Sequence, residues 1–370
     1  METVSNTAHS SPAALQETVS RLRSKPMRWL VTGSAGFIGS HLIEVLLRLG
    51  QQVLSVDNFE TGYRHNLEAV REAVGEAAWE RHEFLEGDIE DLALCRRASA
   101  DVDVVLHQAA LGSVPRSISD PLRAHAVNAT GFLNMLVAAR EAGVHRFVYA
   151  TSSATYGDAP MLPKVEDHVG KPLSPYALTK CVDEMYADVF GRCYGTASIG
   201  LRYFNVFGPR QDPDGAYAAV IPRWFEAMLH GRPAIIYGDG ETTRDFCYIA
   251  NVVQANLLAA TSDDPEAVGQ VYNVAVGGRM SLNALFGTLR DLVRERHPHL
   301  DVPAPAYESF RPGDIRDSQA DIGKARRLLR YEPTHDVRTG LRETLPSYEA
   351  RLRLTGTAPG RDMEHVGNLP

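Results

Sequence analysis

The chain has 370 residues, of which 44% are hydrophobic and 23% charged, and its formal net charge is −8. This length is enough for one large domain or two closely joined ones, and the composition is typical of a globular protein. The acidic balance and the lack of a basic block argue against nucleic acid as a partner, and the lack of a run of about 18 apolar residues argues against a membrane span.

Two further features favour a cytoplasmic location. The segment from Met1 to Lys25 contains no apolar core of the kind found in signal peptides. The four cysteines show no C-x-x-C spacing and fall inside periodic segments, so we expect packed thiols in a reducing compartment. These cysteines are Cys95, Cys181, Cys193 and Cys247.

The first predicted strand leads into a glycine-rich turn. An apolar run that begins at Arg28 reaches Gly33, Gly36 and Gly39, and an amphipathic helix follows from Leu42 to Leu49. Glycine permits a tight turn and a close approach of the backbone to a pyrophosphate, which then faces the N-terminus of the helix. The spacing is G-x-x-G-x-x-G, so the G-x-G-x-x-G fingerprint of dinucleotide-binding folds is not met literally.

A second strand, residues 52–56, delivers Asp57 to its end. A carboxylate in this position would accept hydrogen bonds from both hydroxyls of an adenosine ribose and would repel a 2′-phosphate. The alternative is a solvated aspartate of a turn, but the glycines upstream favour the ribose role. The first two strands therefore predict NAD as the cofactor.

Strands continue to alternate with helices as far as residue 153. We expect a helix from Leu67 to Glu83, a strand from Phe84 that ends at Asp88, a buried strand from Val102 to His107, a helix through Asn128 to Ala142, and a strand from Arg146 to Ala150. Asp88 would meet an adenine or, equally well, cap a helix. Small residues after His107 leave room for a ligand. The β-α-β rhythm predicts a doubly wound parallel sheet.

Tyr176 and Lys180 lie four positions apart on a predicted helix and therefore share one face. A fixed lysine charge beside a phenol favours the phenolate, which can act as a general base. Ser153 precedes this pair by about two dozen residues and can hold the same substrate hydroxyl from a second side. A tyrosine–lysine pair alone is common on amphipathic helices, but the preceding β-α-β pattern favours the catalytic interpretation.

Beyond Asn205 glycine and proline become frequent and the segments shorten, which suits a smaller lobe that closes over the sheet. Arg244 and Arg311 lie there in apolar or turn settings, where a bidentate clamp on a diphosphate explains them better than solvation does. We therefore divide the chain into an N-terminal extension (1–26), a Rossmann domain (27–205), a mixed α/β substrate lobe intertwined with it (206–354), and a tail expected to be disordered (355–370).

Seven motifs in chain order together resemble the extended short-chain dehydrogenase/reductase family, over roughly residues 27 to 350. They are Thr32-Gly33-x-x-Gly36-Phe37-Ile38-Gly39, Asp57-Asn58, Gly87-Asp88, His107-Gln108-Ala109-Ala110, Ser152-Ser153-Ala154-Thr155-Tyr156-Gly157, Tyr176-x-x-x-Lys180 and Leu201–Pro209. Within that family the chain is similar to nucleotide-sugar 4-epimerases. Through Leu111–Ser117 and Gly215–Pro222 it resembles UDP-N-acetylglucosamine 4-epimerases in particular.

The resemblance implies a reversible oxidation at C4 of a hexose, with NAD held tightly and no metal. Ser153, Tyr176 and Lys180 would be catalytic. The cofactor would be held by Gly33, Gly36, Phe37, Ile38, Asp57, Asn58, Asp88, Ile89, Gln108, Tyr176 and Lys180. The UDP-sugar would be held by Gly112, Ser113, Ser152, Ser153, Asn205, Ala219, Arg244, Arg311, Asp314 and Ser318.

Ser318 is the candidate determinant of sugar choice. Related epimerases that accept only non-acetylated sugars often carry a tyrosine at the matching position, whereas a serine leaves volume for an N-acetyl group beside C2. We therefore expect interconversion of UDP-N-acetylglucosamine and UDP-N-acetylgalactosamine, with lower activity on UDP-glucose and UDP-galactose. An ordinary surface serine ahead of the predicted helix 322–329 is the alternative.

Three other functions compete with this one. A 4,6-dehydratase needs an acid–base pair where this chain has Ser152 and Ser153. A 4-epimerase of UDP-N-acetylhexosaminuronic acids needs a cationic or amide donor near C6, for which Arg116 is the candidate, and the sequence leaves this open. A non-catalytic NAD-sensing protein would have no need of Ser153, Tyr176 and Lys180 together.

Two long helical stretches, Leu122 to Glu141 and Tyr176 to Tyr194, carry apolar residues on more than one face, Met185 and Val189 among them. In the family that the chain resembles, the matching helices pair across a dimer as a four-helix bundle. The alternative is that both helices simply pack on the sheet. We expect a homodimer.

Overall fold

The computed structural model describes residues 12–213, 219–310 and 316–354, and its centre is a seven-stranded parallel sheet. The strands are β1 (Arg28–Thr32), β2 (Gln52–Asp57), β3 (His82–Glu86), β4 (Val104–His107), β5 (Arg146–Ser152), β6 (Ser198–Tyr203) and β11 (Gln270–Val274). Their order is β11-β6-β5-β4-β1-β2-β3, and every neighbouring pair is parallel. The predicted doubly wound sheet is confirmed, and its strand order reverses between β1 and β4.

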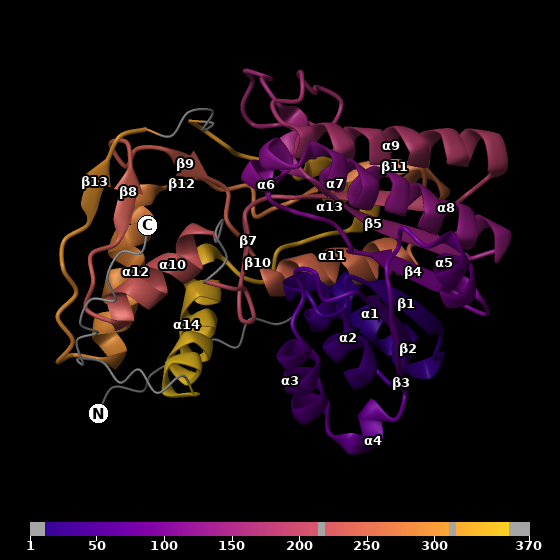
Figure 1. The fold of residues 1–370 in the computed structure, drawn as a ribbon, viewed down its shortest axis with the longest axis horizontal. Helices are drawn as coiled ribbons and strands as arrows, with labels where there is room; N and C mark the ends of the chain where they lie inside the picture. The colour runs from indigo at the N-terminus through magenta and orange to yellow at the C-terminus, as the bar shows by residue number, and fades with distance from the viewer. Residues whose placement is uncertain (1–11, 214–218, 311–315, 355–370) are drawn as a thin grey trace, which may run out of the picture.

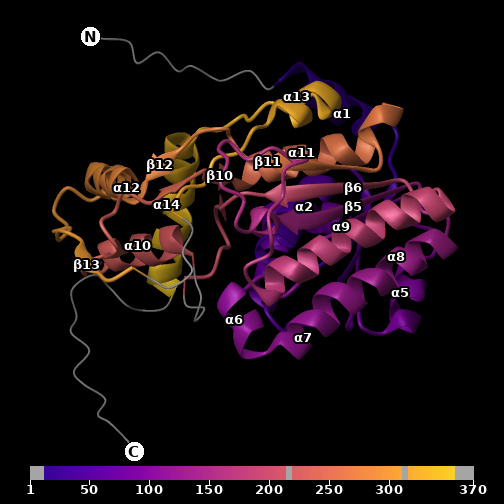
Figure 2. The same ribbon diagram turned by 90° about the horizontal axis from the view of Figure 1, so that it is seen from above.

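Helices cover both faces of the sheet (Figure 2). One face carries α5 (Leu92–Ser99), α8 (Phe132–Glu141) and α9 (Pro175–Tyr194), and the other carries α2 (Phe37–Arg48) and α11 (Ile249–Thr261). Alternate strand residues supply the two cores. Leu30 packs in the cluster that includes Leu136 of α8, whereas Trp29 and Val31 pack in the cluster that includes Val252 of α11.

The N-terminal extension adds a helix to the second face. Helix α1 (Ala13–Ser24) packs on α11, and its Leu22 is buried. The amide of Gln51 donates to the backbone oxygen of Leu22 at 2.8 Å. In the described part of the chain, no helix combines the length and the apolar character needed to cross a membrane.

The remaining elements gather beside the sheet (Figure 1). They are β7 (Val206–Phe207), α10 (Val220–Leu229), β8 (Ile235–Tyr237), β9 (Thr243–Arg244), β10 (Cys247–Tyr248), β12 (Met280–Ser281), α12 (Leu282–Arg296), β13 (Ala306–Glu308) and α14 (Val337–Leu354). Helix α13 (Gly323–Leu329) instead packs on β11 and α11. Strands β7 and β10 pair where the chain leaves the sheet. Because α11 and β11 return to the sheet, the second half of the chain is interleaved with the first.

The expected helix from Leu67 to Glu83 is wrong. The chain forms α3 (Arg64–Val74) and α4 (Glu76–Trp79), because Gly75 between them adopts a φ of 78° that ends the first helix. Strand β3 then begins at His82 and ends at Glu86, so Asp88 lies in the turn that follows the strand. The helix cap of α5 is Asp91, whose carboxylate accepts from the backbone N–H of Ala93 at 2.8 Å.

Two other expectations need correction. The helix expected from Leu122 to Glu141 consists of α7 (Pro121–His125), a π-helical segment η1 (Ala126–Gly131) and α8. All four cysteines are free thiols, but Cys193 is exposed rather than packed, because it lies in the last turn of α9 on its solvent side. The tail expected from residue 355 onward lies outside the described residues.

Candidate active site

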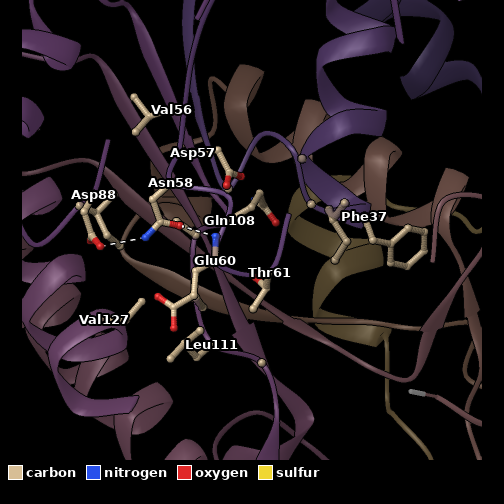
Figure 3. A pocket seen from close by; sticks show the side chains of 18 of the residues that line it. Phe37, Val56, Asp57, Asn58, Glu60, Thr61, Asp88, Gln108, Leu111 and Val127 are labelled. Atoms are coloured by element: carbon tan, nitrogen blue, oxygen red, sulfur yellow. Dashed lines mark hydrogen bonds between the residues drawn. The ribbon is translucent and has the colours of Figure 1, made fainter. Parts of the chain in front are cut away.

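A cavity of about 300 Å³ lies at the carboxyl ends of β1, β2, β3 and β4 (Figure 3). It is lined by nine of the residues predicted to hold the cofactor: Gly33, Gly36, Phe37, Ile38, Asp57, Asn58, Asp88, Ile89 and Gln108. Figure 3 shows Asp57, Asn58 and Asp88 toward one end of the cavity and Phe37 toward the other. The sequence motifs missed Glu60, Thr61 and Val127, which also line the cavity and come from loops and from η1.

The turn between β1 and α2 depends on its glycines. Gly33 adopts a φ of 67°, and a Cβ built on it would lie 2.7 Å from the backbone nitrogen of Ala109. A Cβ on Gly39 would lie 2.1 Å from the backbone oxygen of Gly33. These close approaches bring the N-terminus of α2 to the cavity wall, where its N–H groups and dipole favour a pyrophosphate. The residues therefore fit a dinucleotide.

Asp57 is held rigidly at the end of β2. One carboxylate oxygen accepts from the backbone N–H of Ala35 at 2.9 Å, and the other accepts from that of Phe59 at 2.8 Å. Burial raises the pKa of Asp57, and these backbone hydrogen bonds partly offset the rise. Each oxygen keeps acceptor capacity for a ribose hydroxyl. The Asp57 carboxylate in this position disfavours a 2′-phosphate and fits NAD.

Two amide side chains fix the opposite wall of the cavity. Gln108 accepts from the Tyr203 hydroxyl at 3.0 Å, which ties the end of β4 to β6. Asn128 of η1 bonds the backbone N–H and C=O of Leu111 at 2.7 and 3.2 Å, and it donates to the Thr179 hydroxyl at 3.1 Å. The π-helical turn thus joins the cavity wall to α9, which carries Tyr176 and Lys180.

The three residues predicted to be catalytic lie on two neighbouring elements. Ser153 begins the short 3₁₀ helix η2 (Ser153–Tyr156) directly after Ser152, the last residue of β5. Tyr176 lies in the first turn of α9 and Lys180 one turn further on, and α9 packs against both β5 and η2. The backbone N–H of Tyr176 donates to the Ser117 hydroxyl at 3.0 Å. Ser153 and Tyr176 are half-buried, so a ligand can reach both.

The ammonium of Lys180 lies against a carboxylate that the sequence motifs missed. Its Nζ is 3.1 Å from Oδ2 of Asp183 and donates to the backbone oxygen of Ala150 at 3.1 Å. Lys180 and Asp183 are both buried. Burial raises the pKa of Asp183 to about 7, although the nearby Lys180 charge opposes the rise. The i, i+3 spacing on α9 is the only sequence signal for this pair, and such spacing is common.

A second cavity of about 260 Å³ lies within the smaller lobe, among β7, α10, β8 and β9. Asn205, Ala219 and Arg244, all predicted to bind substrate, line it, and so do the aromatic side chains of Trp224 and Tyr237. Asn205 adopts an unusual φ of 33°, and its amide donates to the backbone oxygen of Asp245 at 3.1 Å.

The two cavities lie near each other. Phe37 of the first cavity is within 3.5 Å of where a Cβ on Gly208 would lie, and Gly208 follows Phe207 of the second cavity. Gly112 lines the first cavity. Residues with the predicted roles for a dinucleotide and for a diphosphate sugar thus surround neighbouring spaces.

The other predicted substrate residues are partly placed. The Ser113 hydroxyl accepts from the backbone N–H of Arg116 at 3.1 Å and caps α6 (Val114–Ser119). Ser318 is half-buried, and its backbone N–H donates to the oxygen of Thr243 at 3.1 Å, beside Arg244 of β9. Arg311, Asp314 and residues 215–218 lie outside the described residues. Within the described part, no cluster of metal-ligating side chains occurs.

The fold, the glycine turn and the ribose-directed carboxylate define a dinucleotide-binding protein of the Rossmann type. The chain belongs to the NAD dependent epimerase/dehydratase family, whose model matches residues 29–275. It is 36% identical over 324 residues to a UDP-glucose 4-epimerase of Mycolicibacterium smegmatis, covering 86% of this chain and 97% of that protein. NAD is the cofactor of this family.

Solved structures of related enzymes superpose closely on the chain. A UDP-N-acetylglucosamine 4-epimerase from Methanobrevibacter ruminantium M1, in complex with UDP-N-acetylmuramic acid, has a TM-score of 0.80 and 36% identity, covering 88% of this chain and 99% of that one. A UDP-glucuronic acid 4-epimerase from Bacillus cereus, in complex with UDP-glucuronic acid and NAD, has a TM-score of 0.77 and 29% identity, covering 88% and 100%.

Proposed function

We propose that the chain is an NAD-dependent UDP-sugar 4-epimerase that interconverts UDP-N-acetylglucosamine and UDP-N-acetylgalactosamine. The observation that carries this proposal is the pair of neighbouring cavities, one lined by residues suited to NAD and the other by Asn205 and Arg244. When bound, NAD accepts a hydride from the sugar and returns it.

The residues of the chain would then handle the proton and hold the sugar. Tyr176 removes the proton of the 4-hydroxyl and later returns it, while Ser153 hydrogen-bonds the same oxygen. Lys180, oriented by Asp183 and the backbone of Ala150, supplies positive charge beside this site. The hexose must present first one face and then the other to the cofactor. The enzyme therefore needs firm contacts to the nucleotide and only a few contacts to the hexose, so that the sugar can turn.

The second cavity suits the nucleotide part of the substrate. Its apolar and aromatic lining, which includes Trp224 and Tyr237, favours a pyrimidine base, and the guanidinium groups of Arg223 and Arg244 favour phosphate oxygens. The backbone N–H of Ser318 donates to the backbone oxygen of Thr243, the residue before Arg244 in β9. This hydrogen bond supports a position of the small serine side chain near the substrate. The similarity to an epimerase of UDP-N-acetylglucosamine supports an acetylated sugar.

Arg116 argues against an acidic sugar. It is the arginine that a uronate carboxylate would need, but its guanidinium already forms an ion pair with Glu60 of the cofactor cavity. Using it for a substrate carboxylate would leave Glu60 with one partner fewer. A neutral N-acetylhexosamine requires no such rearrangement, and we therefore prefer it to the uronate.

We also propose that a second copy of the chain covers the outer face of α7 (Pro121–His125) and α9. Large apolar side chains on these helices and on α6 are strongly exposed: Ile118 by 62%, Leu122 by 83%, Leu178 by 54% and Met185 by 66%. Exposed apolar groups gathered on neighbouring helices are typical of protein–protein interfaces. Pairing of this face with the same face of a second copy would form a symmetric dimer.

The test is incubation of the purified protein with UDP-N-acetylgalactosamine and, separately, with UDP-galactose, followed by chromatographic separation of the C4 epimers. We expect the acetylated sugar to be converted faster. Tyr176→Phe should lower the turnover number by about 100-fold or more and leave substrate binding intact. A protein that only senses NAD would show no turnover before or after this substitution.

Ser318→Tyr tests the choice of sugar. The added ring should reduce turnover of the acetylated substrate and spare that of UDP-galactose. Faster conversion of UDP-galactose by the unmodified protein would contradict the role of Ser318. Conversion of an acidic UDP-N-acetylhexosaminuronate alone would overturn the neutral-sugar proposal.

A further inference from the structure

Five charged side chains form a continuous cluster at the edge of the cofactor cavity, which we call the Glu60 cluster: Glu60, Asp88, Glu90, Arg116 and Arg123. Glu60 and Asp88 line the cavity itself (Figure 3). Arg116 donates to Oε1 of Glu60, and Arg123 donates to both of its carboxylate oxygens. Arg123 also contacts Glu90, and its Nη2 lies 3.3 Å from Oδ2 of Asp88.

The Glu60 cluster joins three segments of the chain. Glu60 lies in the loop between β2 and α3, Asp88 and Glu90 lie in the loop between β3 and α5, and the two arginines belong to α6 and α7. The first two segments follow the strands whose ends would hold the adenosine half of NAD. Helices α6 and α7 face these loops, so the arginines hold both loops from one side.

The geometry is stronger than that of an isolated surface ion pair. The exposed fractions of the five side chains lie between 22% and 35%. Glu60 pairs with both arginines, and Arg123 pairs with all three carboxylates. The Arg123 hydrogen bond lowers the pKa of Glu60, and Glu60 and Glu90 raise the pKa of Arg123. Isolated surface pairs contribute little to stability, but networks with shared partners are the exception.

The same helices touch the catalytic region. Ser117, the neighbour of Arg116 on α6, accepts a hydrogen bond from the backbone N–H of Tyr176 at 3.0 Å. Asn128, which follows α7, bonds the Leu111 backbone of the cavity wall. Arg116 and Arg123 are therefore carried by helices that are anchored to other parts of the site.

We propose that the Glu60 cluster is an ionic latch that closes the adenosine side of the cavity and slows the release of NAD. An enzyme that returns the hydride in each cycle needs no exchange of its cofactor, so slow release is an advantage. For the cofactor to leave on this side, Glu60 must separate from Arg116 and Arg123. The proposal rests on the NAD dependence of the family and not on the identity of the sugar.

The test compares Glu60→Gln with Glu68→Gln, which makes the same change of charge at an exposed position of α3. Purified full-length protein is loaded with NAD and diluted into NAD-free buffer, and the NAD that remains bound is measured over time. We expect Glu60→Gln to release NAD on the order of tenfold faster, which corresponds to about 1.4 kcal/mol. Glu68→Gln should behave as the unmodified protein does.

Ionic strength gives a second readout. In about 1 M NaCl, where the Debye length is about 3 Å, the unmodified protein should release NAD faster than at low salt, and Glu60→Gln should respond less to salt. Equal release rates for Glu60→Gln and Glu68→Gln would overturn the proposal. Fast release from Glu60→Gln combined with salt-independent release from the unmodified protein would also overturn it, because Glu60 would then act by direct contact with the cofactor.

Discussion

Gly39→Ala tests whether the close packing of the β1–α2 turn is what allows the chain to bind NAD. A Cβ on residue 39 would lie 2.1 Å from the backbone oxygen of Gly33 and 2.8 Å from its carbonyl carbon. Ordinary contact begins at 3.4 Å, so the turn and the helix must separate by 3.4 − 2.1 = 1.3 Å. Both neighbours are backbone atoms, and no side-chain rotation can relieve the contact.

The expected effect has two parts. Overpacking of this kind costs about 1–3 kcal/mol of folding free energy. A displacement of about 1 Å at a positioned site costs on the order of 100-fold in its function. Because the displaced atoms form the pyrophosphate-facing end of α2, we expect the variant to fold with a lower melting temperature and to bind NAD on the order of 100-fold more weakly.

Two matched substitutions grade the effect. A Cβ on Gly36 would lie 3.1 Å from the oxygen of Gly33, so Gly36→Ala should be intermediate. Nothing lies within 4 Å of a Cβ on Gly287 in α12, so Gly287→Ala should be neutral or should stabilise the protein by about 0.5–1 kcal/mol. Calorimetric melting with and without NAD measures stability and binding together. An NAD-induced shift in Gly39→Ala as large as that of the unmodified protein would refute the reasoning.

Three further changes have definite expectations. Burial lowers the pKa of His107 from 6.5 to about 3, so the folded protein keeps this ring neutral and loses stability as the pH falls below 6.5. The loss at pH 4.5 is on the order of 2–3 kcal/mol. Urea unfolding of His107→Gln should show a shallower loss between pH 6.5 and 4.5, and an unchanged slope would contradict this. For the proposed dimer, Leu178→Lys should shift sedimentation to that of a monomer, and unchanged sedimentation would exclude α9 from the interface. Arg244→Ala should weaken inhibition by UDP about tenfold, whereas unchanged inhibition would remove Arg244 from the phosphate site.

The features that the sequence predicts well are local ones. Glycines at three-residue spacing, the carboxylate after β2 and the four-residue spacing of Tyr176 and Lys180 each depend on neighbouring residues, and the structure places the predicted cofactor residues of β1 to β4 around one cavity. The break of the helix at Gly75 was also local, but one glycine within a periodic segment is a weak signal.

The contacts that the sequence does not predict join segments far apart in the chain. The carboxylate of Glu60 lies 56 residues before Arg116 and 63 before Arg123, and nothing in the sequence indicates Glu60 as the partner of either arginine. Only the packing of α6 and α7 beside the β2–α3 loop gives them partners. Lys180 and Asp183 are close in sequence, but they form a buried ion pair only because α9 packs on the sheet. The spacing of the two residues does not indicate that burial.

Cofactor retention and sugar choice meet at Arg116. Because its guanidinium is paired with Glu60, a uronate carboxylate would have to compete with Glu60 for it and would weaken the Glu60 cluster in doing so. A neutral hexosamine leaves the cluster intact. Glu60→Gln should therefore lose NAD faster and also bind UDP-glucuronic acid more tightly relative to UDP-N-acetylglucosamine, measured by competition in the epimerase assay. If NAD retention falls while the ratio of the two affinities stays constant, Arg116 does not reach the substrate. That result would support the latch proposal and remove Arg116 from the argument about sugar choice.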